Sequence, residues 1–221
     1  IKKVWQDVNS SDITGTIADN VEVTVAILRY DGKVAGKDTY TPIKEAIKLS
    51  KANNWEFESD YLPKLDDKGN EIVYDVREVE VPSGYWASKA KKDNTFEFTI
   101  TNRKISKTKI DVEKRWLNKD NTELAGNYQP EKITVVLLAN GKEIKTLDVL
   151  KSNGWKGTFT DLDLTDSHGN AIVYEVKEKS ETIPEGFVRE STNKKPNAQG
   201  TVVITNKKVE HDMEQLADKL G

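Results

Sequence analysis

Apolar and polar residues alternate along a stretch of ten residues that occurs twice in this chain. Residues 69–78 read GNEIVYDVRE, and residues 169–178 read GNAIVYEVKE. Alternation after a Gly-Asn turn signal predicts a β-strand whose apolar side chains share one face. That face carries the same three residue types in both copies: Ile72, Tyr74 and Val76, then Ile172, Tyr174 and Val176. Glu78 and Glu178 fall in phase with it, so each copy aims a carboxylate at its core.

Other predicted strands recur in the same order around this stretch. Each copy opens with a short alternating run, continues with a longer apolar run and closes with a run that ends in Ile-Thr-Asn. These runs are residues 1–7, 21–28 and 96–102 in the first copy, and residues 110–116, 133–138 and 201–206 in the second. Asp31-Gly32 and Asn140-Gly141 follow the longer runs and predict the tight turns of two β-hairpins. The repetition predicts an all-β chain of two domains, residues 1–104 and 105–208.

The copies differ most between their first and second tryptophans. This interval is longer in the first copy, and its extra residues, 34–47, predict a surface insertion with a short helical turn at residues 42–47. The linker at residues 103–107 contains no Gly or Pro, which indicates a stiff tandem. The tail, residues 209–221, has apolar residues at helical spacing. It is a docked helix, the start of a following segment, or sequence added to the natural chain.

Three polar residues in each copy are in phase with apolar strand positions, provided that no β-bulge shifts the phase. They are Lys3, Glu78 and Asn102 in the first copy, and Lys114, Glu178 and Asn206 in the second. In a single copy such residues have ordinary roles: a lysine reaches solvent, a glutamate pairs at the surface, and an asparagine caps a turn. Their recurrence at the same positions of a diverged second copy favours a shared function instead.

A buried lysine, glutamate and asparagine have specific chemistry together. Burial lowers the pKa of a lysine and raises that of a glutamate by up to about 3–5 units. A neutral amine is a nucleophile, and a protonated carboxyl group can relay protons. Attack of the amine on the asparagine carboxamide would expel ammonia and leave an amide bond between the two side chains. Folding supplies the proximity that this reaction needs.

The composition narrows the alternatives. The 34 basic and 37 acidic residues of this 221-residue chain give a net charge of −3 with interspersed signs, which argues against a nucleic-acid surface. No apolar run is long enough for membrane insertion, and no signal peptide opens the chain. The lack of cysteine excludes disulfides, thiol chemistry and most zinc sites. Because it begins at Ile1 rather than methionine, the chain is expected to be a piece of a longer protein.

In their order and spacing, these motifs resemble the Cna B-type domains, the stalk repeats of Gram-positive surface adhesins and pilins. The motifs of the first copy are Lys3-Val4-Trp5, Asn53-Asn54-Trp55, Gly69-Asn70, Val73–Glu78, Pro82-Ser83-Gly84-Tyr85 and Ile100-Thr101-Asn102. Those of the second copy are Lys114-Arg115-Trp116, Gly154-Trp155, Gly169-Asn170, Val173–Glu178, Gly186-Phe187 and Ile204-Thr205-Asn206. The chain departs from the family at Ser59, where an aromatic residue is commoner, and at Phe187, which replaces the usual tyrosine.

The resemblance implies two reverse immunoglobulin-like (prealbumin-like) β-sandwiches. It also implies an autocatalytic Lys–Asn isopeptide bond between the first and last strands of each, with the glutamate as proton relay. The implied pairs are Lys3 with Asn102, assisted by Glu78, and Lys114 with Asn206, assisted by Glu178. The implied role is an extracellular, cell-wall-attached stalk. Its partners would be neighbouring domains of the same surface protein, and it would need no cofactor.

Two alternatives to a stalk stay open. One is a ligand-binding adhesin module that contacts host extracellular matrix through residues 34–47, and the other is a pilin subunit fragment. A turnover enzyme is disfavoured, because His168 and His211 have no partners in the repeat and fit surface roles. The acidic loop at residues 161–166 could hold calcium, but it lacks the EF-hand spacing, so solvated turn carboxylates are favoured.

Overall fold

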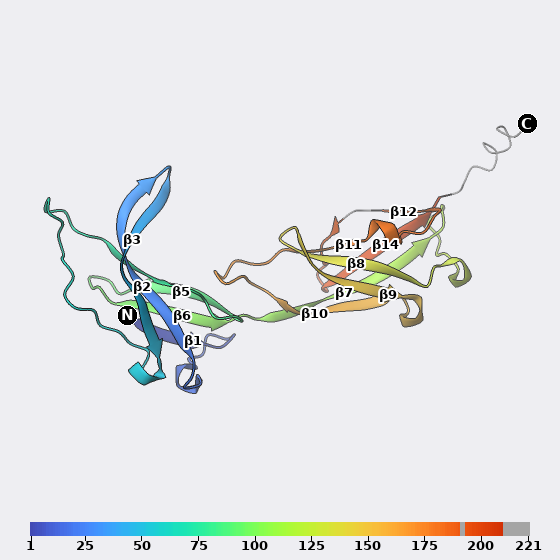
Figure 1. The fold of residues 1–221 in the computed structure, drawn as a ribbon. Coiled ribbons are helices and arrows are strands. Elements are labelled where there is room, and N and C mark those ends of the chain that lie inside the picture. The colour runs from blue at the N-terminus through green and yellow to red at the C-terminus, as the bar shows by residue number, and fades with distance from the viewer. Residues whose placement is uncertain (191–192, 210–221) are drawn as a thin grey trace, which may run out of the picture. The chain divides into compact units, whose positions relative to one another are not determined.

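The computed structural model describes residues 1–190 and 193–209 of the chain. This described part is built from β-strands and short 3-10 turns (Figure 1). The chain divides into two compact units. The first comprises Ile1–Ser106 with Asp163–Ala171, and the second comprises Lys107–Leu162 with the chain from Ile172 onward. Domain boundaries at residues 104 and 208 stay a prediction.

The first unit is a sandwich of two three-stranded sheets, in the orders β1-β6-β5 and β3-β2-β4. Its strands are β1 Lys2–Gln6, β2 Glu22–Val34, β3 Lys37–Ser50, β4 Tyr74–Glu78, β5 Tyr85–Lys91 and β6 Phe98–Lys104, with 3-10 turns at Thr14–Thr16 and Lys51–Asn53. Alternate side chains of these strands point inward and form one core, as the period of two predicts. The core contains Trp5, Val23, Val25, Ile27, Ile47, Leu49, Trp55, Val76, Phe98 and Ile100.

The second unit repeats this plan with two four-stranded sheets, in the orders β10-β7-β14-β12 and β13-β11-β8-β9. Its strands are β7 Lys107–Leu117, β8 Lys132–Ala139, β9 Lys142–Leu150, β10 Lys156–Asp163, β11 Tyr174–Glu178, β12 Phe187–Arg189, β13 Asn193–Lys194 and β14 Thr201–Lys208. Its 3-10 turns are Gly126–Tyr128, Lys151–Asn153 and Ser180–Thr182. It has a core of its own, which includes Trp116, Trp155 and Phe159. The expected pair of tandem β-sandwiches is therefore confirmed.

The first and last strands of each unit are parallel neighbours. β1 pairs with β6, and Trp5 lies opposite Asn102. β7 pairs with β14 in the same way, with Trp116 opposite Asn206. Because the lysine precedes this tryptophan by two residues, it points to the same face of the sheet as the asparagine. The sheet therefore brings both predicted reaction partners into one core.

Two local predictions were wrong. Asp31-Gly32 does not form the hairpin turn, because β2 continues through it to Val34 and turns at Ala35-Gly36. A register shift between Tyr30 and Gly32 leaves Asp31 without a partner position on β3, and the ladder then continues from Gly32, which lies opposite Thr39. Asn140-Gly141, by contrast, does form the predicted tight turn between β8 and β9.

Residues 34–47 form part of this long β2–β3 hairpin (blue in Figure 1), and residues 42–47 are strand rather than a helical turn. β3 is an edge strand, so Pro42 can lie in it without breaking a sheet interior. The repeated strands begin at Tyr74 and Tyr174, which leaves the preceding isoleucines in the connecting loops. Beyond Val209, the predicted helical tail lies outside the described residues.

Candidate functional site

A backbone hydrogen bond fixes the position of each lysine whose side chain points into the core. The Lys3 N–H donates to the Trp55 carbonyl at 2.8 Å, and the Lys114 N–H donates to the Trp155 carbonyl at 2.8 Å. Both tryptophans adopt left-handed backbone conformations, with φ of 61° and 62°. Such angles are costly for bulky residues and persist only where the surrounding structure enforces them. In both units, therefore, a tryptophan with a strained backbone conformation accepts the hydrogen bond that holds the lysine strand.

The first unit brings its three predicted residues together in the core. The Lys3 Nζ lies 3.4 Å from Glu78 Oε2, and the Asn102 Nδ2 donates to Glu78 Oε1 at 2.8 Å. Lys3 and Asn102 are fully buried, and 3% of the Glu78 side chain is exposed. Glu78 comes from β4 in the facing sheet, where it lies opposite Val25 of β2. One carboxylate thus bridges an amine and a carboxamide from the opposite sheet.

The second unit has the same arrangement. The Asn206 Nδ2 donates to Glu178 Oε1 at 3.0 Å, and the Lys114 Nζ lies 3.8 Å from Glu178 Oε2. The Lys114 amine also donates to the Arg115 carbonyl at 3.4 Å. The Lys114 and Glu178 side chains are fully buried. We refer to Lys3, Glu78 and Asn102 as the first triad, and to Lys114, Glu178 and Asn206 as the second triad.

The carboxamide oxygens of both triads have unused acceptor capacity. Among the described residues, Asn102 Oδ1 and Asn206 Oδ1 are buried without a hydrogen-bond partner, as is Glu178 Oε2. A buried acceptor without a donor is unfavourable by about 1–3 kcal/mol. A proton moved from the lysine to the glutamate would supply the missing donor.

Aromatic rings enclose each amine. The Lys3 Nζ lies 5.0 Å from the ring centroid of Trp5, and the Lys114 Nζ lies 4.1 Å from that of Trp116. Trp116 packs edge-on against Trp155 and Phe187, with centroid distances of 5.2 Å and 5.1 Å. Phe187 thus takes the place against Trp116 that Tyr85 takes against Trp5 in the first unit. These rings exclude water from the amine and strengthen electrostatic interactions around it.

Burial changes the protonation of these groups. It lowers the pKa of Lys3 to about 8 and that of Lys114 to about 7, although the nearby glutamates act in the opposite direction. Burial also raises the pKa of Glu178, which Lys114 partly offsets. In the second triad, both shifts lower the free-energy cost of moving a proton from the Lys114 ammonium to the Glu178 carboxylate. Burial thus favours the neutral forms of both the Lys114 amine and the Glu178 carboxyl group.

Sequence reasoning missed two features of the site. The tryptophans helped to identify the repeat, but their spacing did not predict that Trp5 and Trp116 lie against the lysine amines. It also missed Arg189, which lies opposite Asn206 on β12 and donates to the Glu178 carbonyl at 3.0 Å. The matching position of β5 is Ala87, opposite Asn102. Aligning the two copies after their Pro-x-Gly turns would have revealed this difference.

The other candidate residues do not form a site. His168 is exposed, and His211 lies outside the described residues. In the acidic loop, the Asp166 carboxylate accepts the His168 and Asn170 N–H groups at 2.9 Å each, as a turn does. No cluster of three potential metal ligands occurs within residues 1–190 and 193–209. Over the same residues, no helix has the length and apolar character to span a membrane.

Comparison with known proteins supports a common origin for the two units. The family described as "Cna protein B-type domain" matches residues 1–103 and again residues 110–207. A collagen adhesin of Staphylococcus aureus is 37% identical over 213 residues, which are 93% of this chain but only 15% of the adhesin. The chain thus spans a small part of the length of this relative.

Solved structures with similar chains include a single B repeat unit (B1) of the collagen-binding surface protein Cna of Staphylococcus aureus. It is 28% identical, covers 95% of this chain and 96% of its own, and has a TM-score of 0.39. A streptococcal ancillary pilin is 16% identical, with coverage of 95% and 62% and a TM-score of 0.43. With the family match extending over nearly all of both repeats, this chain belongs to the Cna protein B-type domain family.

Proposed function

We propose that each unit joins its first strand to its last by an amide bond between the lysine and asparagine side chains of its triad. The observation that supports this proposal is the buried contact of amine, carboxylate and carboxamide, which occurs twice. A triad with only a packing role would be a costly way to fill a core, because buried ionic groups rarely stabilise more than apolar residues of similar volume.

The reaction needs only groups that the triad contains. Proton transfer from the lysine ammonium to the glutamate carboxylate gives a neutral amine and a protonated acid. The amine attacks the carboxamide carbon while the acid donates to the carboxamide oxygen. The glutamate then moves the amine proton to the leaving nitrogen. The original C–N bond breaks, ammonia departs, and the carboxamide oxygen returns its proton to the glutamate as the C=O bond re-forms. One amide bond replaces another, so no oxidant, cofactor or metal is required.

The bond would make each unit a spacer that transmits tension. Tension that enters through the first strand would pass directly to the last strand, and the sheets between them would carry little force. We infer that the chain is part of the stalk of a Gram-positive cell-wall-attached surface protein, with neighbouring domains of that protein as its partners. The role is structural, with a single intramolecular reaction rather than enzymatic turnover.

A matrix-binding role for the β2–β3 hairpin is the second candidate. The hairpin exposes 66% of Val34, 41% of Tyr40 and 40% of Ile43, which is unusual for apolar side chains in a structural extension. This exposure favours a contact surface, but no described residue there forms a recognisable ligand pocket. The role of a pilin subunit fragment also stays a prediction.

Intact-mass measurement tests the proposed bonds. The wild-type chain should be lighter than its sequence mass by two molecules of ammonia. Glu178→Gln should lack one of these losses, and the further change Glu78→Gln should abolish both, because the proton relay is gone. The matched control Glu175→Gln, on the opposite face of β11, should retain both. A wild-type mass equal to the sequence mass would refute the mechanism.

The pH dependence of stability provides a second test. An Asn206→Ala variant keeps the Lys114 amine free and buried. The folded amine releases its proton above about pH 7, whereas in the unfolded chain it holds the proton up to its ordinary pKa of 10.5. Between these values the unfolded state binds more protons, so the stability of the variant should rise with pH. The rise is at most about 1.4 kcal/mol per pH unit.

Wild-type protein supplies the reference for this test, since a lysine already in amide linkage does not titrate. Urea unfolding of both chains from pH 6 to 10 should give curves that converge as the pH increases. A constant difference between the two over this range would show that Lys114 is not a buried free amine in the variant.

A further inference from the structure

Arg189 connects the two sheets of the second unit beside its triad. It belongs to β12 and lies directly opposite Asn206 of β14. Side chains of directly opposite residues on neighbouring antiparallel strands point to the same face, so Arg189 points inward as Asn206 does. Its guanidinium group donates to the Glu178 carbonyl of β11, in the facing sheet, at 3.0 Å. The residue paired with the asparagine of the triad therefore holds the backbone of its glutamate.

Glu178 lies where β11 ends, and this position explains the contact. The Lys179 N–H donates to the Thr134 carbonyl of β8. Since the hydrogen-bonding groups of successive strand residues point to opposite sides, the Glu178 carbonyl points away from β8. On that side, within the described part of the chain, β13 pairs with β11 only as far as Lys177. The Arg189 guanidinium thus supplies the donor at the first position beyond this ladder.

The first unit has a different contact between its sheets. The position that matches Arg189 is Ala87, whose side chain is too short to reach the facing sheet. Lys89 of β5 instead donates to the Val76 carbonyl of β4 at 3.1 Å. This carbonyl precedes Glu78 by two residues. The cation of the first unit therefore supports the glutamate strand farther from the carboxylate that reacts.

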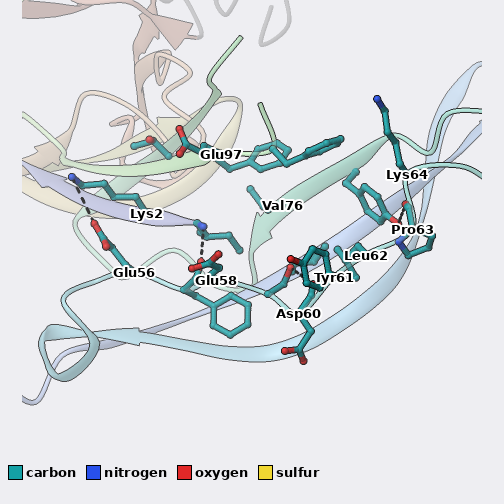
Figure 2. A pocket seen from close by; sticks show the side chains of 18 residues that line it. Lys2, Glu56, Glu58, Asp60, Tyr61, Leu62, Pro63, Lys64, Val76 and Glu97 are labelled. Carbon is teal, nitrogen blue, oxygen red and sulfur yellow. Dashed lines mark hydrogen bonds and ion pairs between the residues drawn. The ribbon is translucent and has the colours of Figure 1, made fainter. Parts of the chain in front are cut away.

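The edge of the second unit is open beside the Arg189 contact. A pocket of about 440 Å³ has Glu178 and Arg189 in its lining, together with Val136, Glu143, Lys177, Lys179, Ser180 and Glu181. The Glu178 side chain is nevertheless fully buried. The pocket of the first unit that Figure 2 shows includes Val76 in its lining but neither Glu78 nor Ala87. A hydrogen bond that keeps the glutamate in place is therefore most useful in the second unit.

We propose that Arg189 is a positioning residue for the cross-link of the second unit, an inference that rests on the proposed function. By holding the Glu178 backbone, it fixes the carboxylate between the Lys114 amine and the Asn206 carboxamide. It exchanges no proton, and the bonds that form and break are those of the proposed reaction. A misplacement of about 1 Å can slow a positioned reaction on the order of 100-fold. Loss of Arg189 should therefore slow the second cross-link and leave the first unchanged.

The rate of cross-linking at each triad of the intact chain tests this role. Newly synthesised chains are quenched in acid at intervals and digested, and mass spectrometry measures the cross-linked peptides of each triad. In Arg189→Met the second cross-link should form about ten-fold more slowly or worse, with the first as internal reference. Arg189→Lys keeps a charged donor and should restore most of the rate. The fluorescence of the buried tryptophans should match that of the wild type and report that the second unit has folded.

Lys145→Met is the matched control. Lys145 of β9 also donates to a carbonyl of the facing sheet, that of Thr160 in β10, at 3.2 Å. These two strands lie at the other edge of the second unit. The variant therefore loses a similar hydrogen bond between the sheets without affecting Glu178, and both cross-links should form at the wild-type rate.

The pH profile of cross-linking separates positioning beside Glu178 from a loss of stability. At low pH, Glu178 takes up a second proton while Lys114 stays an ammonium, so the reaction slows. The Arg189 charge lowers the pKa of Glu178, as the Lys114 charge does, against the larger effect of burial. Removing Arg189 should move the acidic limb of the second cross-link to higher pH. Glu190 and Lys194, which also act on the Lys114 amine, are unchanged.

Arg189→Gln provides a second variant, because it keeps a neutral donor and removes the charge. Its acidic limb should shift as in Arg189→Met, with a smaller loss of rate. A second cross-link that is complete as early in Arg189→Met as in the wild type would overturn the inference. Equal slowing in Lys145→Met, or an unshifted limb in both Arg189 variants, would also overturn it. Wild-type chains that lose no ammonia at either triad would refute the proposed function itself, and the inference with it.

Discussion

A Lys114→Met chain should lose about 4.7 kcal/mol of unfolding free energy in the second unit relative to the cross-linked protein. The proposed bond closes a loop of nearly a hundred residues between Lys114 and Asn206, and the loop-entropy relation for covalent cross-links gives this magnitude. Methionine has a similar length and is apolar, so it removes the amine without a large change in packing. Denaturant unfolding, followed by the fluorescence of the buried tryptophans, measures the loss.

Two further variants separate the cross-link from local effects. Asn206→Ala and Glu178→Gln also prevent the bond, and each adds its own packing or hydrogen-bond loss of about 1–3 kcal/mol. All three variants should lose the same unfolding free energy that the cross-link contributes. Asn102→Ala should instead destabilise the first unit, because each unit has a separate core. Wild-type stability in Lys114→Met would contradict a covalent link.

Under mechanical force, cross-linked and uncross-linked chains should differ in the length of chain that they release, and this effect should be larger than the difference in stability. If the proposed amide bond joins Lys114 to Asn206 in the wild type, tension on the two ends passes through that bond and the intervening residues do not extend. In Lys114→Met the second unit should open and release roughly 300 Å of chain, from about 3.3 Å per residue over the intervening loop. Single-molecule extension of the two chains measures this step.

The first unit supplies the control for the force experiment. Lys3→Met should release a step of its own, and the double variant should show two. The Glu175→Gln chain, whose triads are intact, should show neither. A wild-type chain that extends in two steps would exclude the proposed load path.

The triads could be predicted from sequence because two simple signals coincide in them. Side chains of a strand alternate, so a residue in phase with Val76 or Val176 points inward whatever its polarity. Because the glutamate recurs at the same position of the second copy, it is distinguished from a surface glutamate that lies at a strand end by chance. In the structure both glutamates do meet a lysine and an asparagine from the facing sheet. Their chemistry stays a proposal.

Features that depend on pairing could not be predicted in this way. Asp31-Gly32 has the composition of a turn, but the ladder of β2 with β3 continues past it, since a bulge accommodates Asp31 as the extra residue. Residues 56–63 occupy the place of β10 in the first repeat, directly after the second tryptophan, yet they do not form a strand. Arg189 was missed because its importance comes from its register with Asn206. Periodicity describes one strand at a time and says nothing about its neighbours.

The parallel pairing of the terminal strands also sets the distance between the points at which the chain enters and leaves each unit. The chain enters at the start of one strand and leaves at the far end of its neighbour, so the two points are separated by the length of the pair. For the seven paired positions of β7 and β14, this separation is roughly 23 Å. Antiparallel terminal strands would return the chain to the end where it entered. Within each unit, the points at which the chain enters and leaves therefore lie at opposite ends of the strand pair.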